Sequence, residues 1–467
     1  MKKFIATLLI LSMVFAMAAC AAKTASSDTA AASTGSAKAA SASSTAEAAA
    51  SASSPAASES AAPVTLTYWL PCNDLEDGAA EQKGIVAAAK AFMEANPNIT
   101  LDLVPIGGNS DDYNAKFQMA ATANNLPDLM NVSYGYVKQW ANTGVIMNLD
   151  DIASEISGNY KTDALDFANA AVDGYWAVPY MAEVQGWAYN TEILSKYNLE
   201  VPTTFDEFLN VCKVLTDNGQ LAISHGATDI WAIWGYHAMF CQMGVDQALC
   251  EKLSAKEEDF YSNEAFRNTL AHIQEIAKTG AYGDAVAYTS DAEAKANFIS
   301  GNAAMYCFAT SFVSDLDASE YADKFVFNFG PQFSDSLHQG ETVGLRTYGW
   351  NCYAGSCVEK DPAKLAAVKA WLSYLTSADG TAVLAANGTI PATDPTSADT
   401  SKLDGFMQTI YSAVGDTSVY SVPDLCQAWF DASVKAPYRN AVTSIITGAA
   451  DIDGAMQLLA DWQSSIS

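Results

Sequence analysis

The strongest constraint on the fold is the strand–helix–strand pattern that begins at Val64. Residues 64–70 alternate in polarity as a strand does, and Ile99 to Val104 predicts a second strand. Between them, apolar residues recur at helical spacing from Ile85 to Met93, and Asn96-Pro97 ends the helix. A helix that connects two strands at this spacing predicts a βαβ unit and therefore a parallel sheet.

A second segment, Val178–Asn190, is apolar and aromatic-rich, with no basic residue and a single carboxylate, Glu183. Its strand-like pattern predicts the floor of a ligand cleft and a first crossing between two lobes. A lone acid among Tyr, Trp and Gln side chains suits a hydrogen-bond acceptor for a neutral hydroxylated ligand better than a proton shuttle. Residues 344–353 and 388–393 are the candidates for a second and a third crossing.

The size and charge of the chain limit its domain number and its partners. A length of 467 residues exceeds what one hydrophobic core usually supports, so we expect two lobes. The net charge of −29 argues against a nucleic-acid partner, because binding phosphate backbones needs basic surface.

The N-terminal residues predict export. Lys2 and Lys3 precede an apolar run too short for a spanning helix of about 20 residues, which indicates a signal peptide over residues 1–20. Its end, Met17-Ala-Ala-Cys20, resembles a bacterial lipobox and implies lipid attachment at Cys20; the alternative is an ordinary signal peptide with a chance cysteine. Residues 21–62 are almost wholly Ala, Ser and Thr, which predicts a disordered tether.

Motifs for catalysis, metals or cofactors are missing from the sequence. No G-x-S-x-G, H-E-x-x-H, Walker or dinucleotide motif occurs, and no Cys/His spacing suits zinc, so we predict no catalytic residue, metal or cofactor. The eight cysteines after Cys20 leave two alternatives open. They are buried free thiols, or they form disulfides such as Cys352–Cys357 and Cys241–Cys250.

Polar and aromatic side chains follow two strands of the predicted parallel sheet. Asn73 and Asp74 follow the first strand, and Tyr134 and Tyr136 follow the third. Ligands of open α/β sheets bind beyond the carboxyl ends of the strands, so we expect these residues on one rim. The full set of candidate ligand-binding residues is Asn73, Asp74, Tyr134, Tyr136, Glu183, Trp231, Trp234, Arg346, Trp350 and Trp429.

Several short stretches together resemble one protein family. They are Ala91-Phe92 with Asn96-Pro97, Leu126–Asp128, Val178–Tyr180 with Tyr189-Asn190, Pro202–Phe208, Gly301–Met305 and Ile390-Pro391. In this order, residues 64–467 resemble the extracellular solute-binding proteins of sugar-binding ABC importers, related to maltose-binding protein. The resemblance implies an α/β, two-lobed periplasmic-binding-protein-like fold (type II) with three interlobe crossings. The expected lobes are 64–181 plus 350–390 and 182–346 plus 395–467.

The resemblance also implies a function. It predicts a monomeric binding protein, not an enzyme, that captures a carbohydrate between hinged lobes and delivers it to ABC permease subunits. With Cys20 lipidated, the protein would sit at the extracytoplasmic face of the cell membrane. By position, Glu183 falls on a sugar-contacting Glu of the family and Trp429 on a stacking Trp. The chain departs from the family at Ala309–Phe312, where the family has Gly-Pro-Trp.

The chemistry of these side chains suits a sugar independently of the resemblance. Tryptophan rings can cover the C–H faces of a pyranose, while carboxylates and amides bind its hydroxyls. Because the Arg346 guanidinium can bind an acidic group, an acidic sugar remains an alternative ligand. The alternatives are another solute class, such as a polyamine, a sugar phosphate or a peptide, and a surface glycoside hydrolase.

Overall fold

The computed structural model of the chain describes residues 62–76, 80–108, 110–395, 405–416, 418–430 and 432–466. The predicted signal peptide, Cys20 and nearly all of the predicted tether lie outside these residues. Residues 60–467 form one compact unit of their own, and the elements described below belong to it.

Within the described residues, nine strands form a single mixed sheet with the main order β2-β1-β3-β8-β4-β6-β5. Strand β7 pairs with β4, and β9 pairs with β8. The strands are β1 Val64–Leu70, β2 Ile99–Pro105, β3 Leu129–Ser133, β4 Val178–Asn190, β5 Leu221–Ser224, β6 Ala303–Ala309, β7 Phe325–Asn328, β8 Val343–Ala354 and β9 Tyr420–Val422.

The predicted βαβ unit is confirmed. Helix α1, Ala80–Ala95, connects β1 to β2, and the two strands pair in parallel along their full length. Strand β3 also runs parallel to β1, so the carboxyl ends of β1, β2 and β3 lie at the same edge of the sheet. This edge carries the loop with Asn73 and Asp74 and the short 3₁₀ helix η1, Tyr134–Tyr136.

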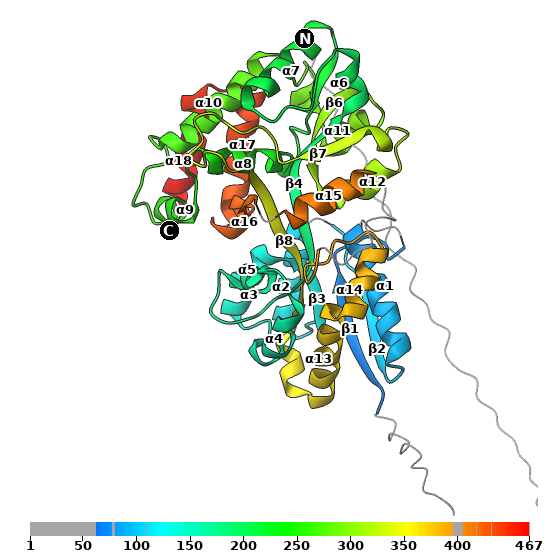
Figure 1. Cartoon of the computed structure of the whole chain (residues 1–467). Helices are drawn as coiled ribbons and strands as arrows, with labels where there is room; N and C mark the ends of the chain where they lie inside the picture. Colours follow the sequence, from blue (N-terminus) through cyan, green and yellow to red (C-terminus); the bar gives the residue numbers. More distant parts are fainter. Residues whose placement is uncertain are drawn as a thin grey trace, which may run out of the picture. The chain divides into compact units, whose positions relative to one another are not determined.

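Two long antiparallel strands, β4 and β8, join the two ends of the sheet (Figure 1). The first residues of β4 pair with the last residues of β8, which itself pairs with β3. The last residues of β4 pair with β6 and β7 instead. Residues 390–392 run beside β4, because Ala182 N donates to Ile390 O at 2.8 Å and Ala392 N donates to Tyr180 O at 3.1 Å.

Helices pack around this sheet. They are α2 Ser110–Thr122, α3 Val137–Thr143, α4 Asp150–Ile156, α5 Ala164–Asn169, α6 Thr191–Lys196, α7 Phe205–Asp217, α8 His237–Gln242, α9 Gln247–Ser254, α10 Glu264–Lys278, α11 Asp291–Ile299, α12 Val313–Asp317, α13 Pro362–Thr376, α14 Ala378–Ala386, α15 Gly405–Gly415, α16 Leu425–Ala428, α17 Lys435–Ile446 and α18 Ile452–Ser465. None of the helices in the described ranges combines the length and apolar character needed to cross a membrane.

Local residues set the starts of two helices. Thr204 and Glu207 form a capping box at the start of α7, and Asp361 caps α13 with Pro362 at its first position. Trp231 and Trp234 lie on a 3₁₀ helix, η3, Ile230–Tyr236.

Separate hydrophobic clusters form on either side of the β4–β8 pair. One surrounds β1, α1 and α13, with Phe92 and Trp371 at its centre. Another surrounds α7, α10 and α17, and contains Phe208 and Phe266. Separate cores of this kind support two lobes, whose residue boundaries stay predictions. The eight cysteines after Cys20 are all free thiols, and all but Cys357 are buried.

His225 is a buried polar residue just after β5. It lies between the rings of Tyr236 and Tyr282, each with its centroid 5.7 Å from the imidazole. Neither ring nitrogen has a hydrogen-bond partner among the described residues. Burial therefore disfavours the charged imidazolium and lowers the pKa of His225 from 6.5 to about 4.

This shift predicts a pH-dependent loss of stability. Between pH 6.5 and 4 the unfolded state binds the His225 proton and the folded state does not, so stability falls as the pH falls. We expect the wild type to lose about 3 kcal/mol more unfolding free energy across this window than His225→Leu. Urea unfolding at a series of pH values measures the difference, and parallel profiles for the two proteins would contradict it.

A candidate ligand site around Glu183 and Tyr134

Glu183 occupies an irregular point of the β4–β8 ladder. It is 8% exposed and pairs in register with Thr347. The register shifts between Met181 and Glu183, which indicates a β-bulge. The carboxylate lies over Gly349, because a Cβ atom on Gly349 would be only 2.0 Å from Glu183 Oε2. The bulge and the missing side chain together make room for a carboxylate in a strand that is buried along its whole length.

Tyr134 lies near Glu183 although the two residues come from different strands. Burial raises the pKa of the Tyr134 phenol well above its usual value, and the nearby charges of Asp424 and Glu183 raise it further. Ser133, just before Tyr134, pairs with Trp350 of β8, and Met181 of β4 pairs with the same Trp350. The structure therefore brings Tyr134, Glu183 and Trp350 into one neighbourhood, built from β3, β4 and β8.

Helix α16 and the start of α17 contribute the opposite side of this neighbourhood. Helix α16 lies against η1. Asp424 caps α16, with its Oδ1 accepting from Cys426 N at 2.9 Å. Lys435 is buried, and its Nζ lies 5.7 Å from the ring centroid of Tyr136, a cation–π distance. Trp429 ends α16, half-buried against the core of α7, α10 and α17.

Asp424 and Lys435 are functional candidates that sequence reasoning missed. The Ser-Val-Pro-Asp stretch ahead of α16 does carry a helix-start signal at Asp424. Lys435 has no local signal, because it becomes a buried cation only through its tertiary placement beside Tyr136.

The other predicted site residues lie elsewhere or have other contacts. Asn73 and Asp74 are exposed in the loop after β1, and Asn73 packs on Gly107 at the end of β2. Trp234 is half-buried, with its ring 6.1 Å from Phe312. The side chain of Trp231 lies outside the described part of the chain.

Arg346 faces away from Glu183. It is next to Thr347, the partner of Glu183, and neighbouring residues of a strand point to opposite faces. Its guanidinium donates to Val414 O at 2.8 Å and to Asp416 O at 3.1 Å, so it satisfies carbonyls at the end of α15. This structural role leaves the ligand-binding prediction for Arg346 without support from its surroundings.

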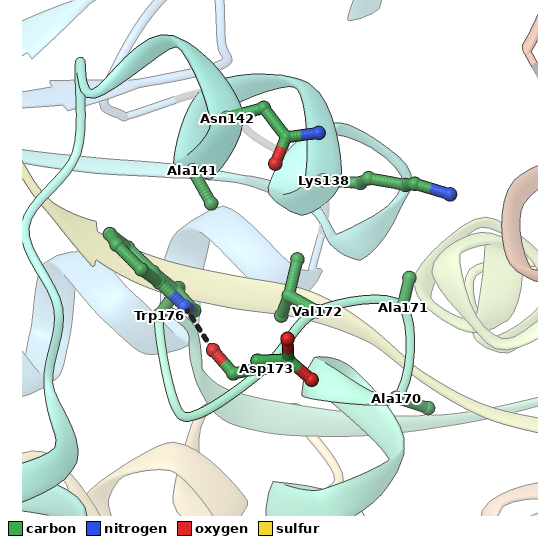
Figure 2. Close-up of a pocket in the computed structure, with 8 residues that line it drawn as sticks. All are labelled: Lys138, Ala141, Asn142, Ala170, Ala171, Val172, Asp173 and Trp176. Carbon is green, nitrogen blue, oxygen red and sulfur yellow. Dashed lines mark hydrogen bonds between the residues drawn. The ribbon is translucent and has the colours of Figure 1, made fainter.

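A separate recess lies between α3 and the segment before β4 (Figure 2). Its cavity volume is about 390 Å³, and the indole nitrogen of Trp176 donates to the carbonyl of Asp173 at its edge. It is lined by Lys138, Ala141, Asn142, Ala170, Ala171, Val172, Asp173 and Trp176. No predicted ligand-binding residue lines this recess, so it is distinct from the Glu183 neighbourhood.

The Glu183 neighbourhood suits binding of hydroxyl groups. The Glu183 carboxylate can accept hydrogen bonds, and the Tyr134 hydroxyl can donate or accept one. Trp350, which pairs with Met181 of β4, offers aromatic surface.

Comparison with known proteins agrees with this fold. The GacH receptor of Streptomyces glaucescens has a solved structure, unliganded and with acarbose, that matches with a TM-score of 0.67 at 21% identity, covering 86% of this chain and 98% of that one. A chitin oligosaccharide binding protein matches with a TM-score of 0.70 at 18% identity, covering 86% and 99%. The fold is thus the α/β, two-lobed type II fold of periplasmic binding proteins, with three interlobe crossings.

The sequence places the chain in a family. A model of the bacterial extracellular solute-binding proteins matches residues 74–382, and the chain belongs to that family. A probable sugar-binding periplasmic protein of Rhizobium meliloti is 24% identical over 139 residues, which cover 29% of this chain. The chain matches only 34% of the length of that curated relative.

The position of the Glu183 carboxylate over Gly349 predicts the effect of one substitution. Gly349→Ala forces the carboxylate to move, which we expect to cost about 1–3 kcal/mol of unfolding free energy, as overpacking does. Gly158→Ala is the matched control, because a Cβ atom on Gly158 meets nothing within 4 Å. Urea unfolding of both variants gives the comparison, and equal stabilities would show that Gly349 makes no such room.

Proposed function

We propose that this protein is the substrate-binding lipoprotein of an ABC importer. It captures a mono- or oligosaccharide between two hinged lobes and delivers it to a membrane permease. The observation that supports this most directly is the buried carboxylate of Glu183, set over Gly349 and beside Tyr134, at the strands that connect the two cores. The sugar-binding name of a relative and the oligosaccharide named for a structural neighbour point to the same ligand class.

The ligand chemistry follows from the burial of these groups. A buried acceptor such as Glu183 is costly to leave without a donor, so a ligand hydroxyl at that position is selected over an analogue that lacks it. Aromatic surface from Trp350 and Trp429 then covers the C–H face of the ring. Of the ten candidate residues, we place Glu183, Tyr134, Tyr136, Trp350 and Trp429 in contact with the ligand, together with Asp424 and Lys435.

The remaining parts of the proposal concern the rest of the chain. Residues 1–20 act as a lipoprotein signal peptide, Cys20 carries the lipid, and residues 21–62 tether the body to the extracytoplasmic face of the membrane. The body acts as a monomer without enzymatic activity. Its lobes are residues 64–181 plus 350–390 and residues 182–346 plus 395–467.

One observation favours a second candidate function. The carboxylates of Glu183 and Asp424 both lie near the Tyr134 phenol. Two acids around one position suit a cationic ligand such as a polyamine, or the carboxylate pair of a glycoside hydrolase. Sugar release during incubation with oligosaccharides detects the hydrolase.

A thermal-shift panel tests the ligand class. A carbohydrate present at 100 times its dissociation constant should stabilise the folded protein by about 2.7 kcal/mol and raise the melting temperature. Monosaccharides, oligosaccharides, polyamines, sugar phosphates and peptides are compared at equal concentrations. A response to a polyamine or a peptide with none to any sugar would reject the carbohydrate proposal.

Trp429 is the aromatic residue whose removal tests the site most simply. Trp429→Ala should weaken carbohydrate binding by at least about 1 kcal/mol, because the ligand loses a stacking surface. Trp176→Ala is the control, since Trp176 is also half-buried but lines the separate recess of Figure 2. Titration calorimetry measures both affinities. An unchanged affinity in folded Trp429→Ala, or an equal loss in the control, would remove Trp429 from the site.

A further inference from the structure

Three buried side chains that carry metal-binding atoms lie close together near η1. His237, Asp424 and Cys426 each offer one ligand atom, and these atoms all lie within 4.8 Å of one another. His237 Nδ1 is 3.8 Å from Asp424 Oδ1. Each of the three residues is at most 4% exposed. Imidazole nitrogen, carboxylate oxygen and thiolate sulfur are each a donor type that zinc accepts in tetrahedral sites.

Independent observations show unused polar atoms around this cluster. The Tyr134 hydroxyl is buried and makes no hydrogen bond of normal geometry within the described residues, although it lies beside the backbone of Asp424. Tyr134 belongs to η1, which lies against α16, the helix that carries Cys426. His237 Nε2 is also buried without a partner in the described part of the chain. Buried polar atoms without partners are rare and often mark a water or an ion.

The contacts that already hold the cluster together do not prevent metal binding. His237 Nδ1 accepts a hydrogen bond from Leu425 N at 3.1 Å, and Asp424 Oδ1 accepts one from Cys426 N. If a metal binds His237 Nδ1, the only hydrogen bond lost there among the described residues is the one from Leu425 N, a neutral donor in the first turn of α16. The Asp424 carboxylate has a second oxygen, so it can keep its cap and bind a metal as well.

We propose that His237, Asp424 and Cys426 form a Zn²⁺ site, with a water as the fourth ligand next to the Tyr134 hydroxyl. When the metal binds, a Cys426 S–Zn bond forms and the thiol proton leaves to solvent. His237 comes from α8, Cys426 from α16 and Asp424 from the N-cap of α16, so the ion ties α16 to α8 and fixes the short helix that ends at Trp429. The Zn²⁺ site shares Asp424 and Tyr134 with the proposed sugar site, whereas His237 and Cys426 belong to the metal cluster alone, so metal binding is measured without any sugar present.

Metal binding to the reduced, full-length protein tests the proposal. One equivalent of Zn²⁺ should raise the melting temperature, and an excess of chelator should reverse the rise. Co²⁺ in place of Zn²⁺ should give a thiolate-to-cobalt charge-transfer band, together with visible bands of tetrahedral cobalt. Cys426→Ser should abolish the charge-transfer band and weaken Zn²⁺ binding at least tenfold.

Two further variants make the result specific. Asp424→Asn retains an N-cap side chain for α16 but loses the charge, and it should also weaken Zn²⁺ binding. Cys212→Ser removes another buried free thiol, from α7, and should leave both the Co²⁺ spectrum and the Zn²⁺ stoichiometry unchanged. A wild type without the charge-transfer band, or a band that survives in Cys426→Ser, overturns the proposal even if a variant fails to fold.

Discussion

The antiparallel pairing of β4 with β8 is the interaction on which the rest of the structure depends. Strand β4 is buried at all thirteen positions. Its first residues pair with β8, and its last residues pair with β6 and β7. Every backbone group of such a strand needs a partner, so the pairing fixes the register of both strands. The hydrophobic cluster around β1, α1 and α13 and the cluster around α7, α10 and α17 are thereby joined through one continuous ladder.

The same ladder explains where polar chemistry appears. A regular strand pair leaves little space for a charged side chain in a buried layer, and carboxylates are rarely buried without partners. The bulge beside Met181 and the glycine at position 349 create that space for Glu183. From the other side, η1 and α16 bring Tyr134, Asp424 and Lys435 toward it. A group of buried polar side chains is thus held by rigid strands and short helices.

Much of the fold could be predicted from local signals in the sequence. Alternation from Val64, helical spacing up to Met93 and the stop at Asn96-Pro97 specify β1, α1 and β2 because each element is set by its own residues. The capping residues Thr204 and Asp361 act over a few positions, so the sequence signal of each helix start is also local. The segment around Glu183 was readable as a long buried strand, because its single charge lies in an apolar run.

The site was less predictable, since its residues meet only through tertiary packing. Asp424 and Lys435 join Tyr134 and Tyr136 because α16 packs against η1 and Lys435 lies over the Tyr136 ring, contacts that no short-range pattern encodes. The same holds for His237, which lies 188 residues before its hydrogen-bond donor Leu425. Arg346 shows the same limit: its charge does not encode its direction, whereas its position one residue from Thr347 turns it toward the end of α15.

A crystal structure of the protein with the carbohydrate that gives the largest thermal shift tests the central claim most directly. We predict ligand density at the β4–β8 bulge, with a sugar hydroxyl hydrogen-bonded to the Glu183 carboxylate and a tryptophan ring against the sugar face. Density confined to the recess lined by Lys138 and Trp176, with Glu183 making no ligand contact, would contradict the account.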